Sequence, residues 1–136
     1  MEVETISLKL DMDWSYEELY QAVGTITRQF PLLKCHECAI AIRSWLRRRQ
    51  VPNKIWKIST HHSDEDFILS GRLEQQGITD SITDNGIHYG VEVRGKIFDN
   101  LSPHGMTLEE WVQDFHSISD EFDVTSFENL QRGKNG

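Results

Sequence analysis

The hairpin-like segment at residues 87–100 constrains the fold more than any other part of the chain. Apolar and polar side chains alternate along residues 87–93, which is the two-residue period of a strand with one apolar face. Arg94 and Gly95 follow as a tight turn, and residues 96–100 read as the returning strand. The sequence therefore predicts two antiparallel strands joined by a two-residue turn.

The register of this hairpin decides whether His88 and Asp99 can meet. Pairing of Val93 with Lys96 places residue 99 opposite position 90 of the first strand. His88 and Asp99 are then diagonal neighbours on one face, roughly 7 to 8 Å apart at the backbone, where a carboxylate can orient an imidazole. A turn shifted by one residue would move them two positions further apart, beyond contact unless a bulge intervenes. Gly90, on the same face, is expected to leave room for a cysteine-bearing helix.

A second motif places a thiol at the start of a helix. After Cys35, apolar residues recur at helical spacing on one side and arginines lie largely on the other. The run ends before Pro52, because a proline disfavours a helical residue in front of it. Cys35 is therefore expected in or next to the first turn. A free thiol has a pKa of about 8.5, and a helix N-terminus and a nearby imidazolium both favour its thiolate.

Cys35, His88 and Asp99 together supply a thiol, an imidazole and a carboxylate. In a cysteine enzyme the thiolate attacks a carbonyl, the imidazole accepts and returns a proton, and the carboxylate fixes the imidazole tautomer. Each of the three lies on an element suited to its task. The sequence thus predicts a catalytic triad.

Five features follow one another along the chain: a Cys-x-x-Cys-Ala motif, a histidine strand, a Phe-Asp-Asn motif, a glycine turn and a tryptophan-bearing helix. They are found at residues 35–39, His88, residues 98–100, residues 105–106 and Trp111. In this order they resemble the papain fold toxin 2 family of bacterial, notably cyanobacterial, proteins. The cysteine helix is also similar to the nucleophile helix of bacterial transglutaminase-like proteins. The resemblance extends over residues 15–118.

The resemblance implies an α+β, papain-like/transglutaminase-like fold in which an N-terminal nucleophile helix packs on an antiparallel sheet. It implies a toxin-like cysteine hydrolase or acyl transferase, most simply a protein glutamine deamidase, with peptidase (thiol protease) and transglutaminase as alternatives. It also implies that Gln29, six residues before Cys35, helps to bind the oxyanion. The expected partners are a protein substrate and an immunity or antitoxin protein. The alternative function is an inactive papain-fold binding module in a toxin/antitoxin-type pair.

Cys38 is the alternative nucleophile. It lies one turn further along the apolar side of the helix, where burial opposes ionisation, so Cys35 is favoured. The two cysteines could also form half of a zinc site, but no second pair exists, and His61 and His62 point to different sides of an extended segment. A redox pair would be expected to follow a strand, which this motif does not. We therefore expect no metal and no cofactor.

Composition limits the partners and the number of domains. The formal net charge of −8 argues against nucleic acid, because phosphate binding depends on basic side chains. A chain of 136 residues suits a single domain, expected over residues 1–130 with a disordered tail at 131–136. An apolar leader and a long apolar run are both missing, so we expect no membrane contact. The expected location is the cytoplasm of the producing cell, with delivery to a target cell as the toxin-like role.

The remaining segments complete an α+β scaffold. Residues 67–75 fit a helix or a strand equally well. Strands are expected at residues 4–10, 54–60 and 122–127, and further helices at residues 16–30 and after Thr107.

Overall fold

The computed structural model describes residues 8–128. Its main sheet has four antiparallel strands in the order β4-β3-β1-β6. These strands are β1 (Lys54–Thr60), β3 (Ile87–Val93), β4 (Lys96–Phe98) and β6 (Phe122–Phe127). A smaller sheet pairs β2 (Leu69–Ser70) with β5 (Phe115–His116). The helices are α1 (Tyr16–Thr27), α2 (Cys35–Arg48), α3 (Gly71–Gln75) and α4 (Leu108–Gln113), with a 3-10 turn η1 (Asp11–Asp13) before them.

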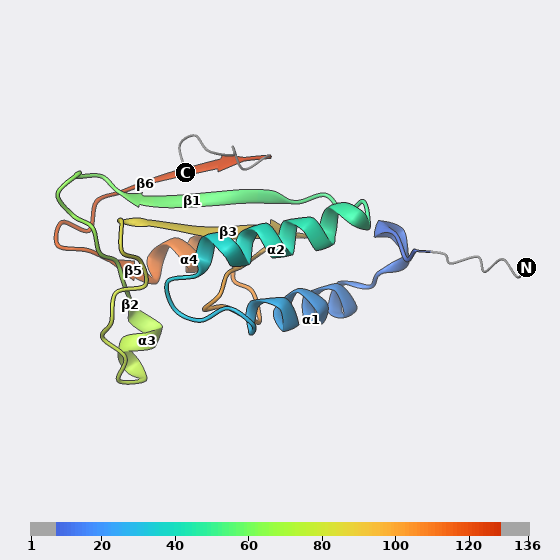
Figure 1. The fold of residues 1–136 in the computed structure, drawn as a ribbon, viewed down its shortest axis with the longest axis horizontal. Coiled ribbons are helices and arrows are strands. Elements are labelled where there is room, and N and C mark those ends of the chain that lie inside the picture. Colours follow the sequence, from blue (N-terminus) through green and yellow to red (C-terminus); the bar gives the residue numbers. More distant parts are fainter. Residues whose placement is uncertain (1–7, 129–136) are drawn as a thin grey trace, which may run out of the picture.

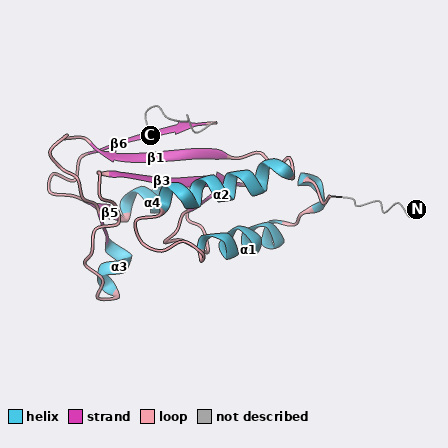
Figure 2. Cartoon of the chain, viewed as in Figure 1, coloured by secondary structure: helices cyan, strands magenta, loops and turns pink. Residues whose placement is uncertain are grey.

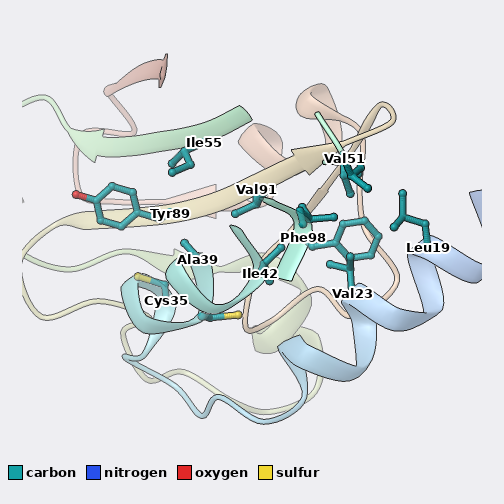
Figure 3. Close-up of a cluster of buried hydrophobic side chains, with 13 residues drawn as sticks. Leu19, Val23, Cys35, Ala39, Ile42, Val51, Ile55, Tyr89, Val91 and Phe98 are labelled. Atoms are coloured by element: carbon teal, nitrogen blue, oxygen red, sulfur yellow. The ribbon is translucent and has the colours of Figure 1, made fainter. Parts of the chain in front are cut away.

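Helices α1 and α2 pack on one face of the main sheet, with α2 lying along β3 (Figure 1). Apolar side chains from both helices meet the apolar side of β3 and β1 there (Figure 3). The members of this first core cluster include Leu19, Val23, Ile42, Leu46, Ile55, Val91 and Phe98. Burial of this surface from water is the main stabilising contribution to the fold.

The opposite face of the sheet is also buried. A second core cluster collects Ile58, Ile68, Ile82, Ile97, Trp111 and Phe115. Helix α4 and the strand β5 supply part of it, while α3 projects from the same end of the molecule (Figure 2). Because both faces are covered, successive side chains of β3 enter two different cores.

The turn between β3 and β4 has the predicted register. Val93 pairs with Lys96, and the two turn residues have positive φ angles, 46° for Arg94 and 84° for Gly95. A two-residue turn with φ > 0 at both positions matches the twist of a β-hairpin. The Arg94 side chain is held in place by the carbonyl of Trp14, at 2.7 Å, and by the carboxylate of Asp11, at 2.9 Å. The hairpin prediction is confirmed.

Several expected boundaries need correction. The first helix ends at Thr27 rather than at residue 30, and the strand after the turn ends at Phe98 rather than at residue 100. Residues 67–75 contain both a short strand and a short helix, β2 and α3. Of the strand expected at residues 4–10, the described residues 8–10 have no strand structure. The expected tail at residues 131–136 lies outside the described residues.

Among the helices of the described residues, every one is too short or too polar to cross a membrane.

Candidate active site

A buried imidazole and a buried carboxylate form the centre of the candidate site. Nε2 of His88 donates a hydrogen bond to Oδ2 of Asp99 over 2.7 Å, and both side chains are fully buried. Burial alone would lower the pKa of His88, but the charge and hydrogen bond of Asp99 outweigh it and raise that pKa. Burial would likewise raise the pKa of Asp99, and the imidazolium and its hydrogen bonds lower it instead. Both pKa shifts favour the imidazolium–carboxylate form of the pair over the neutral form.

Both oxygens of Asp99 receive further hydrogen bonds. The indole Nε1 of Trp111 donates to Oδ2 over 2.8 Å, and the backbone N–H of Leu101 donates to Oδ1 over 2.8 Å. A hydrogen bond with Ser102 also lowers the pKa of this carboxyl. A carboxylate with donors on both oxygens has a fixed orientation, so the imidazole that it binds is fixed as well.

Aromatic rings enclose His88 on the second-core side of the sheet. The ring of Trp111 stacks on the imidazole with 5.9 Å between centroids, and Phe115 meets it edge-on at 5.1 Å. The alternation of β3 explains this placement, because His88 and Gly90 share one face. A Cβ on Gly90 would come within 3.1 Å of Cζ2 of Trp111 and 2.6 Å of Cγ2 of Ile97. The expectation that Gly90 makes room for the cysteine helix is therefore wrong, because its missing side chain makes room for Trp111 and Ile97.

Cys35 is the first residue of α2, and the residue is 6% exposed. Ser15, Ser70 and Thr107 cap the other three α-helices through their side chains. The N-cap of α2, Lys34, makes no such side-chain hydrogen bond. The first N–H groups of α2 therefore have no side-chain acceptor from the N-cap, and the positive end of the helix dipole lies at Cys35.

The second ring nitrogen of His88 is the one available to the thiol. Nδ1 is buried and has no partner of regular hydrogen-bond geometry within the described part of the chain. Hydrogen bonding and charge of Cys35 nevertheless contribute to the raised pKa of His88, after the larger effects of burial and Asp99. The thiol of Cys35 is therefore near enough to affect the pKa of the imidazole, which is hydrogen-bonded to Asp99.

The short strand β4 explains how a helix on one face and an imidazole on the other can interact. β4 pairs only with the last three residues of β3, so beside His88 the sheet has a paired strand on the β1 side alone. The loop before α2 passes this open edge. Asn100 donates a hydrogen bond to the carbonyl of Pro31 over 2.8 Å, and Leu32 packs against the second core cluster. Cys35 thus enters its helix beside the uncovered edge of β3.

Cys38 occupies a different environment from Cys35. Its side chain is fully buried in the first core cluster. Burial, followed by the charges of Asp99 and Cys35, raises the pKa of Cys38 to about 12. This thiol is therefore protonated at neutral pH and packs as a small apolar group.

Gln29 lies two residues after the end of α1, and its side chain is exposed. Its backbone N–H donates to Ile26, while its side chain makes no hydrogen bond with another described residue. Among the described residues, no group of three or more metal-ligating side chains is arranged to hold a metal ion. His61 and His62 instead pair with the acidic residues Asp123 and Glu121.

Sequence patterns do not reveal the donors to Asp99. Trp111 belongs to the family-like motif described above, but nothing in the sequence indicates a role for its indole N–H. A tryptophan directly after a Thr-x-x-Glu capping box is a visible signal for a buried helix residue, whereas its distant acceptor leaves no sequence pattern. The Leu101 N–H is a backbone group, so the sequence carries no sign of it.

Residues 18–116 match the family model for papain fold toxin 2. No curated protein and no solved structure matches the chain. The matched segment covers more than half of the chain and contains both cysteines, His88, Asp99 and Trp111. Helices packed against an antiparallel sheet agree with the papain fold that the family is named for. The chain therefore belongs to the papain fold toxin 2 family.

Proposed function

We propose that this protein is a cysteine hydrolase or acyl transferase in which Cys35 is the nucleophile. The observation that carries the proposal is the buried His88–Asp99 pair, whose free ring nitrogen is left for a thiol at a helix N-terminus. An imidazolium next to a thiol favours the thiolate, which is the reactive form. Cys38 is disfavoured as the nucleophile because its pKa is raised to about 12.

The reaction would proceed in two steps. The Cys35 thiolate attacks the carbonyl carbon of an amide, and the C–N bond breaks as His88 gives its proton to the leaving nitrogen. Ammonia or an amine leaves, and a thioester remains. His88 then accepts a proton from water, whose oxygen attacks the thioester; the C–S bond breaks, the carboxylic acid leaves, and the Cys35 thiolate and the imidazolium are restored. Asp99 keeps the Nε2 side of the imidazole protonated throughout, so that Nδ1 exchanges the proton.

The oxyanion of each tetrahedral intermediate would form at the start of α2. The N–H of Cys35 lies at the uncapped N-terminus, where it can donate to a developing negative charge. The Gln29 side chain is proposed as the second donor. Its exposed position after α1 requires the side chain to turn towards the thiol when substrate binds.

The proposed substrate is a glutamine side chain of another protein, and the products are glutamate and ammonia. Hydrolysis of a backbone amide and transfer to an amine would use the same three groups. The choice of a glutamine side chain is therefore proposed on the basis of family membership. An immunity or antitoxin protein is proposed as a second partner, also on family grounds alone. Neither proposal depends on a cofactor.

Thiol reactivity tests the nucleophile directly. We expect iodoacetamide at pH 6 to modify Cys35 selectively in the native protein, because at that pH an isolated thiol is almost entirely protonated. Peptide mass mapping identifies the modified cysteine. The Cys38→Ala variant should react at the same rate as the parent protein, and Cys35→Ala should lose the fast reaction while remaining folded.

Ammonia release from glutamine-containing peptides then tests the reaction. Cys35→Ala and His88→Asn should both abolish release, and Cys38→Ala should retain it. Equal and slow labelling of both cysteines would contradict the proposed enzymatic function and favour the inactive binding module. Loss of activity in Cys38→Ala but not in Cys35→Ala would show that the nucleophile is assigned to the wrong cysteine.

A further inference from the structure

The side chain of Arg72, at the start of α3, bridges two segments that are far apart in the sequence. Its Nη2 donates to Oγ of Ser102 over 2.9 Å, and its Nη1 donates to the carbonyl of Leu101 over 3.3 Å. Its Nε lies 3.2 Å from Oδ2 of Asp114. A guanidinium can hold both segments at once because its donors diverge from one rigid plane.

The Asp114 end of this bridge is firmly anchored. The Asp114 side chain is 5% exposed, and its Oδ1 accepts the backbone N–H of Arg72 over 2.9 Å. The Ser70 hydroxyl donates to its Oδ2, and the Gly71 N–H donates to its backbone carbonyl over 2.8 Å. The beginning of α3 is thus fixed to the residue that ends α4.

Both bridged segments lead to Asp99. Leu101, whose carbonyl accepts from Arg72, donates its own N–H to Oδ1 of Asp99. Trp111, which lies in α4 three residues before Asp114, donates its indole N–H to Oδ2. Each oxygen of the carboxylate therefore depends on one of the two segments that Arg72 connects.

The geometry points to Arg72 as a positioning residue of the candidate active site, which fixes the Asp99 carboxylate towards His88 by tying residues 101–102 to the end of α4. Arg72 touches neither His88 nor Cys35, so it acts only through Asp99. This inference rests on the proposed function for its catalytic consequence. It also gives a role to the segment between β1 and β3, in which the sequence shows no recognisable motif.

Arg72→Met removes all the side-chain donors at similar length, and Arg94→Met is its matched control. The Arg94 side chain likewise binds a backbone carbonyl, that of Trp14, and a carboxylate, that of Asp11. These contacts lie beside the turn that follows β3. Both variants are made in the Cys38→Ala background, so that iodoacetamide reports on Cys35 alone. Arg72→Lys keeps the charge without the diverging donors and serves if Arg72→Met does not fold.

We expect Arg72→Met to slow alkylation of Cys35 at pH 6 by about threefold or more. The reason is that a misdirected carboxylate stabilises the imidazolium less well. Arg94→Met should lose thermal stability without this change. In an Asp99→Asn background, Arg72→Met should cause no further slowing, because the group through which it acts is gone.

The imidazole N–H signal of His88 in proton NMR separates this inference from the proposed function. Arg72→Met should shift that signal upfield, towards a weaker hydrogen bond to Asp99, and Arg94→Met should not. Absence of selective Cys35 labelling in the parent protein would overturn the proposed enzymatic function. The NMR comparison would still decide whether Arg72 positions Asp99. Identical NMR and alkylation behaviour of Arg72→Met and Arg94→Met would overturn the positioning role.

Discussion

The indole of Trp111 and the imidazole of His88 share one oxygen of Asp99. Their nitrogens lie 2.8 and 2.7 Å from Oδ2, and the two rings are inclined by only 29°. Two ring N–H groups that donate to the same oxygen leave the carboxylate little freedom to rotate. The orientation of the His88 imidazole is therefore coupled to the packing of α4, the helix that carries Trp111.

Trp111→Phe should weaken the site through Asp99. It keeps a ring beside the imidazole and removes the indole donor, and a hydrogen bond to a charged group contributes about 1.5 to 3 kcal/mol. We expect slower alkylation of Cys35 at pH 6 and a lower free energy of unfolding. Trp56→Phe is the control, because Trp56 donates its indole N–H to Glu92 over 2.7 Å on the same sheet. Equal alkylation rates in the two variants would argue against this coupling.

The His88–Asp99 pair should impose a characteristic pH dependence on stability. The pKa of His88 is raised above its ordinary 6.5, so its stabilising contribution is complete below that pH and declines as the pH rises. The pKa of Asp99 is lowered below 3.8, so its contribution is complete above that pH and declines as the pH falls. Both contributions are complete only between about pH 4 and 6.5.

The Asp99→Asn variant tests this pH dependence. Its free energy of unfolding in urea is measured from pH 4 to pH 9 and compared with that of the parent protein. The buried His88 of the variant has lost its counter-charge, so it is neutral when folded, and its burial disfavours folding at low pH. The stability difference between the parent protein and the variant should therefore be largest near pH 5 and shrink above pH 6.5. A difference that does not change with pH would show that the pair is not ionised.

Gly90→Ala should destabilise the protein by about 1 to 3 kcal/mol, the usual cost of overpacking. The added methyl group would stand 2.6 Å from Ile97 and 3.1 Å from Trp111. Gly71→Ala is the matched control, because its nearest neighbour, Nε2 of His116, lies at an ordinary 3.5 Å. Thermal unfolding of both variants gives the comparison, and an unchanged midpoint in Gly90→Ala would mean that Trp111 can move aside.

Cys38 should become reactive only when the protein unfolds. Because its pKa is raised to about 12 by burial, a disulfide reagent at pH 8 should react rapidly with one thiol of the native protein. The second thiol should react after addition of urea, and Cys38→Ala should lack this slow phase. Rapid reaction of two thiols in native protein would contradict the buried position of Cys38.

The sequence predicted the local geometry of the site well. Alternation along β3 and the Arg94–Gly95 turn were enough to place His88 and Asp99 on one face in the correct register. The start of α2 at Cys35 followed from helical periodicity. Both predictions rest on patterns among residues that are close together in the sequence.

The faces of the sheet could not be predicted in the same way. Alternation shows that His88 and Gly90 point to one side, but not which helix covers that side, and α4 rather than α2 covers it. The donors from Trp111 and Arg72 depend on contacts between distant segments. Such contacts arise from tertiary packing, which single-sequence patterns do not encode.

The brevity of β4 has a consequence for how this scaffold tolerates change. A strand extended by three residues would place a backbone opposite His88, and its ladder hydrogen bonds would occupy the gap at the open edge of β3, beside which Cys35 enters its helix. Insertions in the loop that follows would leave the chemistry intact only if they preserve that gap. Under the proposed mechanism, the early end of this short strand is thus as much a requirement for reactivity as Cys35 and His88 themselves.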